Sequence, residues 1–350
     1  MRRAALYSFA SMRRPAILIG LLLALGAGPA VAPAQGQVPP TVPAPPAQPA
    51  PPAPVPAPKK GKASVEVKKG MATRRARYVA RGQKLKVVGR VKPFVAGQVA
   101  LLEISRRGKV ISRHRARIRR ARRGGAAIFR IRASRKGRFS VRVRHRATPQ
   151  QKAFRSKWER IKAVTFRAGE GASGTHVLLL QRRMRRMGFA VPVSGSYDGA
   201  TSRAVLAFRK TNNMSRTGYA SPAVYGKLFR NRGAFRAKYP RAGRHVEFDW
   251  SRQVLALMGR NGRPVNVYHS SSGTSATPTV FGKFSFYRKQ PGTNSHGMVQ
   301  SNYFIGGYAV HGYASVPAYP ASHGCLRVPI PDAYAIDAQI SLGETIFVYR

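Results

Sequence analysis

The arrangement of hydrophobic and polar residues changes twice along this chain of 350 residues. Over residues 59–166, apolar and cationic residues alternate, as in FRIRA (129–133) and FSVRVRHR (139–146). Alternation of period 2 is typical of half-buried strands, and LKVVGRVKPFVAGQVALLEI (85–104) indicates two more strands around a Pro/Gly turn. Short strands joined by such turns predict a basic β-sandwich of immunoglobulin-like type over residues 59–167.

A helical pattern follows over residues 171–232. The first predicted helix ends at Gly188 and has one apolar face formed by Val177, Leu180, Met184 and Met187. A second helix is expected to begin near Ala200 and to bury three apolar side chains, those of Ala204, Val205 and Phe208. A third, short helix has Pro222 near its start. The segment is therefore predicted to be a small three-helix domain.

Strand patterns return over residues 243–350. HVEFDW alternates apolar and polar residues, QVLALM and PVNVYHS follow, and GRNGRP (259–264) is the expected hairpin turn between those two. ETIFVYR closes the chain as a strand. We expect a mostly β domain with one long loop region, and Cys325 lies in that region.

The first residues resemble an export signal. MRRAALYSFASMRRP is basic, AILIGLLLALGAG (16–28) is apolar, and AVA (30–32) fits a cleavage site, so residues 1–32 are predicted to be a signal peptide or, if uncut, a membrane anchor. The Pro/Ala tract at 33–58 predicts an extended linker. The protein is therefore expected outside the cytoplasm, at the cell wall, and in contact with the membrane only if the signal is retained.

The charge is strongly positive, with 64 Lys and Arg against 10 Asp and Glu, a net charge of +54. Such a chain attracts polyanions. Nucleic acid is not the usual polyanion outside a cell, so an anionic wall or membrane surface is the expected partner. Only three acidic residues precede residue 170: Glu66, Glu103 and Glu159. The basic β domain either grips an anionic wall polymer or serves as a spacer whose outward face is cationic.

Cys325 is the only cysteine, so no internal disulfide can form, and a single thiol in an exported chain is a candidate nucleophile. A thiol must ionise to attack a carbonyl, and a histidine can take its proton. His323 shares a face with Cys325 if the segment is extended, and His311, 14 residues upstream, can be folded back onto the thiol by the intervening loop. Gly324 allows backbone N–H groups to converge as an oxyanion site. The carbonyl of Gly312 can orient an imidazole.

Residues of the helical segment resemble a known family. The order LQRRMRRMGF, GSYDGATSRAVLAFRKTNN and TGYASPAVYGKL is similar to the three-helix peptidoglycan-binding module. The resemblance implies binding to peptidoglycan, although glutamine is usual in the family where Arg209 stands. A helical spacer of the same fold without a ligand is the alternative.

The cysteine segment resembles a second family. HGYASVPAYPASHGCLRV is similar to the signature of the L,D-transpeptidase catalytic domain of YkuD type, and SSGTSATPTVFGKF (271–284) resembles the strand and turn upstream of it. The resemblance implies that Cys325 is the nucleophile and His311 its base, oriented by the carbonyl of Gly312. It further implies that His323 supports the site and that N–H groups at Gly324 and Cys325 bind the oxyanion.

Three further residues are expected to contact substrate: Ser322, Arg327 and Tyr308. Guanidinium groups bind carboxylates in bidentate fashion, although Arg327 could instead pair with Asp332 or a loop carbonyl. Tyr303 and Tyr313 line a groove or pack at its rim, and His296 is expected on a flanking loop.

The sequence therefore predicts an exported cysteine L,D-transpeptidase that acts on peptidoglycan stem peptides and needs no cofactor or metal. Three alternatives stay open: an L,D-carboxypeptidase with water as acceptor, a zinc site of His311, His323 and Cys325, and a non-catalytic wall anchor. The spacing of those three ligands is unusual for zinc.

Overall fold

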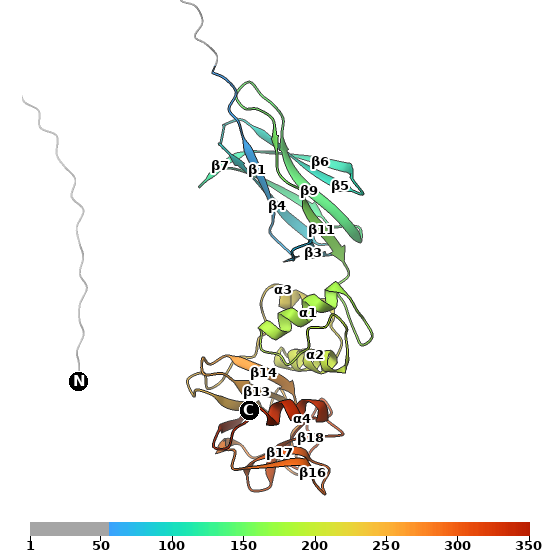
Figure 1. Cartoon of the computed structure of the whole chain (residues 1–350), viewed down its shortest axis with the longest axis vertical. Helices are drawn as coiled ribbons and strands as arrows, with labels where there is room; N and C mark the ends of the chain where they lie inside the picture. The colour runs from blue at the N-terminus through green and yellow to red at the C-terminus, as the bar shows by residue number, and fades with distance from the viewer. Residues whose placement is uncertain (1–55) are drawn as a thin grey trace, which may run out of the picture. The chain divides into compact units, whose positions relative to one another are not determined.

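A computed structural model describes residues 56–350, which are mostly β with four helices (Figure 1). The predicted signal peptide and most of the predicted linker lie outside these residues. None of the helices in the described part of the chain combines the length and the apolar character needed to cross a membrane.

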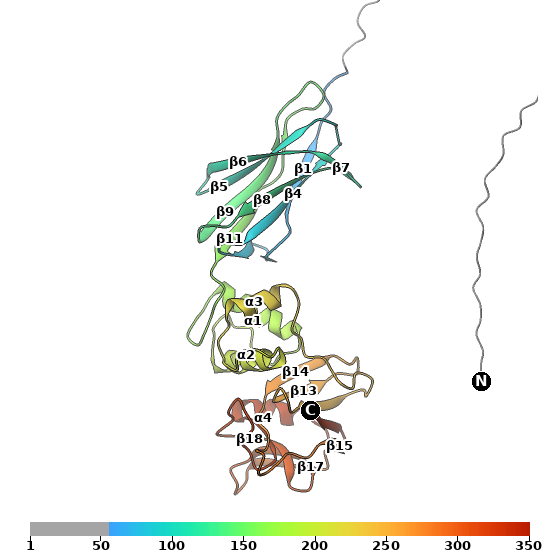
Figure 2. The ribbon, with the colours of Figure 1, turned by 180° about the vertical axis from the view of Figure 1, so that it is seen from behind.

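Two sheets occupy residues 62–164, one with the order β1-β4-β8-β7 and one with the order β2-β3-β11-β9-β5-β6, in which β10 also pairs with β9 (Figure 2). Both contribute side chains to a single buried apolar cluster, including Val87 and Phe129 from the first sheet and Leu102 and Val141 from the second. The strands are β1 (Lys62–Val67), β2 (Met71–Ala72), β3 (Arg77–Ala80), β4 (Lys84–Lys92), β5 (Val99–Arg106), β6 (Lys109–Arg117), β7 (Arg119–Ala121), β8 (Gly124–Arg132), β9 (Gly137–His145), β10 (Phe154–Arg155) and β11 (Glu159–Val164).

Three helices follow: α1 (Thr175–Arg186), α2 (Gly199–Thr211) and α3 (Pro222–Phe229). Most of the buried faces expected from the sequence are confirmed: Val177, Leu180 and Met184 of α1, and the three apolar residues expected from α2, are at most 3% exposed. Met187, the fourth residue expected on the first face, lies just after α1 and is only partly buried. Asp198 caps α2 by accepting a hydrogen bond from the Thr201 N–H at 2.8 Å. Arg209 is buried and donates to the carbonyls of Ser215 and Tyr219. Its guanidinium therefore stabilises the loop that follows α2.

The remaining strands form two further sheets, β14-β13-β12-β20-β15 and β16-β17-β18-β19. The elements are β12 (His245–Asp249), β13 (Val254–Met258), β14 (Pro264–His269), β15 (Gly282–Ser285), β16 (Arg288–Thr293), β17 (Val299–Ile305), β18 (Tyr308–Tyr313), β19 (Leu326–Pro329), α4 (Ile330–Asp337) and β20 (Thr345–Tyr349). The predicted hairpin turn and closing strand are present. Helix α4, which the sequence analysis did not predict, packs on β17, β18 and β19.

The strand predicted at HVEFDW is present as β12, and all five of its residues are buried, the polar ones included. Val246 and Phe248 pack into the apolar cluster of this domain on one face of the sheet, and on the other face His245 packs against Phe347 and Glu247 is covered by residues 238–239. Glu247 is tolerated inside because its carboxylate accepts hydrogen bonds from the Lys238 and Tyr239 N–H groups and from the Tyr349 hydroxyl. A fully paired buried carboxylate avoids most of the cost of lost hydration.

Candidate active site

Cys325 lies at the end of the loop that precedes β19 and is half-buried. The Ala309 N–H donates to its Sγ at 3.4 Å, and the Sγ lies 3.5 Å from the Gly307 carbonyl oxygen, to which the thiol donates. Both partners come from the beginning of β18 and the turn before it. The thiol is therefore held against the start of β18.

The parallel pairing of β18 with β19 brings His311 to the same region. His311 lies opposite Arg327, and the same register continued by two residues places Cys325 beside Ala309. Because alternate residues of a strand point to one face of the sheet, His311 and Cys325 project from the same face. Residues 14 apart in sequence thus become diagonal neighbours on adjacent strands.

His311 is only 3% exposed, and its Nδ1 lies 2.9 Å from the Gly312 carbonyl oxygen. A carbonyl can only accept, so Nδ1 carries the proton and Nε2 keeps a free lone pair. Burial lowers the pKa of His311 to about 4, and the charge of Arg327 acts in the same direction. Burial also raises the pKa of the Cys325 thiol. The resting pair at neutral pH is therefore a neutral thiol beside a neutral imidazole.

Hydroxyl groups fix the loop that carries Cys325. Ser322 is buried, and its Oγ donates to the Cys325 carbonyl at 2.6 Å and accepts from the Gly324 N–H at 3.1 Å. Thr277 donates to the Ser322 carbonyl and Thr279 to the Gly324 carbonyl. Ser322, expected to bind substrate, thus has its hydroxyl occupied by the loop. The roles of the two threonines were missed, and their only signal was the run of hydroxyl residues in SSGTSATPT.

The expected pair of oxyanion donors is only partly free. The Gly324 N–H is engaged by Ser322, whereas the Cys325 N–H has no hydrogen-bond partner within residues 56–350. The free N–H of Cys325 is therefore the stronger candidate donor for an oxyanion formed beside the thiol.

Gly324 is required by its surroundings. Its φ is +113°, and a Cβ added there would lie 2.4 Å from Cε1 of Tyr308, whose ring packs against the loop. We expect Gly324→Ala to destabilise the fold by about 1–3 kcal/mol and to lower activity by displacing Cys325. Thermal unfolding and turnover measure the two effects.

The matched control is Gly343→Ala, which has φ +80° but open space around the added Cβ. The control isolates the backbone strain, so equal losses in the two variants would contradict a steric role for Tyr308.

Arg327 does not pair with Asp332, because Arg203 of α2 binds both oxygens of that carboxylate at 2.9 Å. Its Nη1 instead donates to the Ala321 carbonyl at 3.1 Å, and its guanidinium stacks 4.0 Å above the Tyr313 ring. The alternative of a loop carbonyl is thus the one observed. Arg327 is half-buried, and the N–H groups of its guanidinium that do not bind Ala321 remain able to bind a ligand.

The other candidates are less closely tied to the thiol. His323 is exposed and forms no hydrogen bond within the described part of the chain. Tyr303 is buried and donates to Gln290, and His296 lies exposed on the loop between β16 and β17. Among residues 56–350, no group of three or more His, Cys, Asp or Glu is arranged to hold a metal ion.

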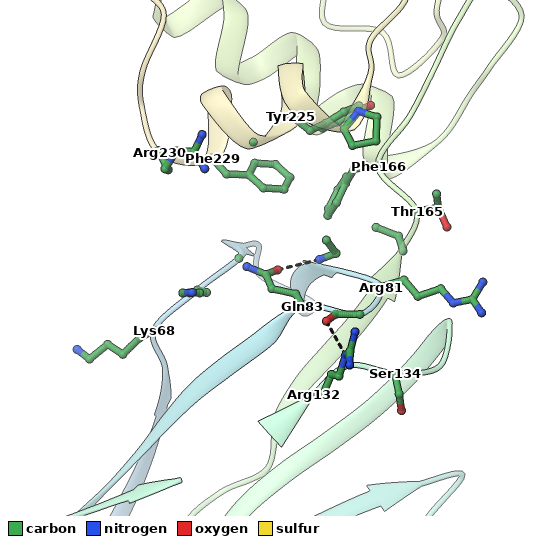
Figure 3. A pocket seen from close by; sticks show the side chains of 17 residues that line it. Lys68, Arg81, Gln83, Arg132, Ser134, Thr165, Phe166, Tyr225, Phe229 and Arg230 are labelled. Atoms are coloured by element: carbon green, nitrogen blue, oxygen red, sulfur yellow. Dashed lines mark hydrogen bonds between the residues drawn. The ribbon is translucent and has the colours of Figure 1, made fainter. Parts of the chain in front are cut away.

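Two hollows of the described chain, of about 1100 and 1220 Å³, are not lined by Cys325. Figure 3 shows one of about 1100 Å³ with an aromatic wall of Phe166, Tyr225 and Phe229 and a rim that includes Arg81 and Arg132. Arg132 donates to the Gly82 carbonyl there at 3.0 Å. Neither a thiol, an imidazole nor a carboxylate lines it, so this hollow is not equipped for acyl transfer.

Comparisons with known proteins agree with the two resemblances. Residues 243–348 match the model of the L,D-transpeptidase catalytic domain (YkuD), and residues 173–228 match that of a putative peptidoglycan binding domain. A search of curated proteins gave no match.

Among solved structures, the chain is similar to an L,D-transpeptidase from Xylanimonas cellulosilytica, with 32% identity over 53% of this chain and 98% of that chain and a TM-score of 0.48. It is also similar to an L,D-transpeptidase from Stackebrandtia nassauensis, with 18% identity, coverage of 52% and 95%, and a TM-score of 0.33. A third, from Mycobacterium smegmatis, is 12% identical, with coverage of 82% and 99% and a TM-score of 0.28.

Proposed function

Since the chain belongs to the L,D-transpeptidases, with a YkuD catalytic domain preceded by a peptidoglycan-binding domain, we propose that Cys325 is its acylating nucleophile and His311 the general base. The observation that carries this proposal is the hydrogen bond from His311 Nδ1 to the Gly312 carbonyl, which leaves Nε2 as the proton acceptor on the face that also presents the thiol. A peptidoglycan-modifying role and a location at the cell wall follow from the two families.

The reaction begins from the neutral pair. His311 Nε2 takes the thiol proton as Sγ attacks the carbonyl carbon of the third residue of a tetrapeptide stem, and the Cys325 N–H binds the oxyanion. Collapse breaks the amide bond, and His311 returns the proton to the amine of departing D-Ala. The thioester is then attacked by an acceptor amine, whose proton passes to His311 and back to the thiol.

The test is mass spectrometry of the full-length protein incubated with a disaccharide-tetrapeptide. An adduct on Cys325 formed with release of D-Ala, followed by a cross-linked dimer, is the expected result. A tripeptide without dimer would assign the L,D-carboxypeptidase, in which water is the acceptor. Absence of both adduct and product, with wall binding intact, would leave a non-catalytic anchor.

We also propose the following organisation of the chain. Residues 1–32 act as an export signal and 33–58 as a linker. Residues 59–167 form an immunoglobulin-like sandwich, 171–232 the wall-binding domain and 243–350 the catalytic domain. The shared apolar cluster of the two N-terminal sheets supports the third assignment.

We also propose that the basic β domain binds an anionic wall polymer. The support for this second activity is that the domain has far more cations than carboxylates to pair with them. Each of the three carboxylates before residue 170 is already paired: Glu66 with Lys68, Glu103 with Arg142 and Glu159 with Arg77. Arg90 also pairs with Glu66, and Arg113 and Arg144 also pair with Glu103. The other cations of residues 59–167 form no ion pair within the described chain. They remain available for an external anion.

Cations gather around one hollow of about 1220 Å³, which no carboxylate lines. Its lining includes eight of them, five from the basic β domain and three from helix α1 of the helical domain: Arg74, Arg75, Arg138, Arg160, Lys162, Arg182, Arg183 and Arg186. None of the eight forms an ion pair within residues 56–350. Unpaired like charges held together favour a polyanion as occupant. A wall polymer with repeated phosphodiesters has this chemistry.

We expect the double variant Arg138→Gln/Arg182→Gln to bind linear polyphosphate more weakly and with a less steep dependence on salt, because two exposed cations leave the hollow. Fluorescence anisotropy over a salt series measures both. Arg260→Gln/Arg263→Gln removes the same charge from an exposed turn of the catalytic domain and serves as the control. Equal weakening in both double variants would show that only net charge matters.

A further inference from the structure

Lys210, in the last turn of α2, carries a buried ammonium group into the catalytic domain. Only 2% of the residue is exposed, and its Nζ lies 3.0 Å from the Gln253 carbonyl oxygen, 2.9 Å from the Ser270 carbonyl oxygen and 2.7 Å from His269 Nδ1. All three acceptors belong to the catalytic domain. An ammonium group has three protons, so each contact has a donor.

His269 connects Lys210 to the backbone of Val316 through its two ring nitrogens. Its Nε2 lies 2.8 Å from the Val316 carbonyl oxygen, so Nε2 carries a proton and Nδ1 accepts from Lys210. Burial lowers the pKa values of both Lys210 and His269 and so opposes a charge on either group. The three acceptors around Nζ act against this on Lys210, because a neutral amine has two protons and would leave one acceptor without a donor. The contacts therefore favour protonated Lys210 beside neutral His269.

A second cation of the same domain reaches the same segment. Arg216, in the loop after α2, donates from Nη1 to the Ala318 carbonyl at 2.6 Å and from Nη2 to the Ser251 carbonyl at 3.1 Å. Val316 and Ala318 both lie in residues 314–321, which connect β18 to the cysteine loop. The helical domain thus reaches residues 314–321 in two ways: Lys210 through His269, and Arg216 directly.

Residues 314–321 contain no helix or strand, so individual hydrogen bonds from neighbouring residues hold them in place. Within the catalytic domain, Ser271 Oγ donates to the Tyr319 carbonyl, the Ala321 N–H donates to the Ser272 carbonyl, and Arg327 binds the Ala321 carbonyl. The stretch leaves β18 just after His311 and enters the loop that ends in Cys325. A shift in it therefore changes the distance between base and thiol.

We propose that Lys210 and Arg216 are positioning residues for acyl transfer at Cys325, through which the peptidoglycan-binding domain holds the segment between His311 and the thiol. This inference rests on the proposed function. The helical domain accordingly has two roles, since it supports the active site in addition to its expected contact with the wall.

The experiment compares Lys210→Met and Arg216→Met in the full-length protein with two controls, Lys283→Met and Arg260→Met, which remove exposed cations of the catalytic domain. One readout is kcat and KM with a disaccharide-tetrapeptide. The other is the rate at which iodoacetamide alkylates Cys325 as a function of pH, which needs no turnover. We expect kcat to fall about tenfold or more, as small displacements of reacting groups do, with KM within about twofold. The alkylation profile should shift as well.

Arg216 is exposed, so its variant is expected to fold even if loss of the buried Lys210 contacts prevents folding. Folded Arg216→Met with unchanged kcat and an unchanged alkylation profile would overturn the proposal, as would the same result in folded Lys210→Met. A wild-type protein that is alkylated normally but releases no D-Ala would instead disprove the proposed function, while the alkylation profiles would still report on positioning.

Discussion

Replacement of Cys325 by alanine is expected to abolish release of D-Ala and formation of the thioester, with a loss of at least about 10⁴-fold. The described chain offers no second thiol, because Cys325 is the only cysteine in the sequence. Mass spectrometry of the protein after incubation with a disaccharide-tetrapeptide measures the adduct, and chromatography measures the product.

Binding of the Cys325→Ala variant to isolated cell walls is the control, and it should match that of the wild type, because the helical domain and the basic strands are unaltered. Cys325→Ser, which keeps the size of the side chain, should be nearly as inactive. Residual D-Ala release at the wild-type rate in either variant would exclude the thiol as nucleophile.

Replacement of His311 by glutamine is expected to lower kcat by about 10²- to 10⁴-fold, the usual contribution of a positioned general base. Glutamine fills similar space but cannot take the thiol proton. The matched control is His323→Gln, since His323 is exposed and lacks hydrogen bonds within the described residues. A larger loss in His323→Gln than in His311→Gln would transfer the role of base to the histidine nearer in sequence.

The pH dependence of these variants follows from the buried imidazole. Because burial lowers the pKa of His311 to about 4 from an ordinary value of 6.5, the base stays neutral down to about pH 4, and the acid limb of kcat/KM should lie near that value. The folded state disfavours the protonated form. Stability should therefore fall as pH falls from 6.5 towards 4, and His311→Gln should lose less over this window. An acid limb near pH 6.5 in the wild type would contradict a buried neutral base.

Much of the site was predictable because the chemistry is local in sequence. Cys325, His323 and Gly324 stand within three residues, and the sequence signature resembles a family with a thiol nucleophile. The choice between His311 and His323 was open from the residues alone. The register of β18 against β19 places His311 on the same face as Cys325, whereas His323 is exposed.

Contacts between residues far apart in sequence were not predictable. Asp332 pairs with Arg203, which lies 129 residues away in sequence, and not with Arg327. Lys210 forms a hydrogen bond with His269, which lies 59 residues away. A buried lysine in AFRKTNN has no local signal, because its burial depends on a strand of another domain. Helix α4 was missed for a similar reason: IPDAYAID has only a weak apolar face, and two of its residues, Ala333 and Ile336, become buried by packing on the sheet.

The sequence by itself determined the change from strand to helix and back to strand along the chain, most of the buried residues of α1 and α2, and the loop that contains the thiol, because these depend on residues close to each other in sequence. The tertiary structure alone decided that β12 is buried on both faces, that Ser322 holds the loop, and that Lys210 and Arg216 reach residues 314–321. Those outcomes depend on strand order and register. Local patterning does not determine strand order, because an alternating strand can pair with any strand whose apolar face lies on the same side of the sheet.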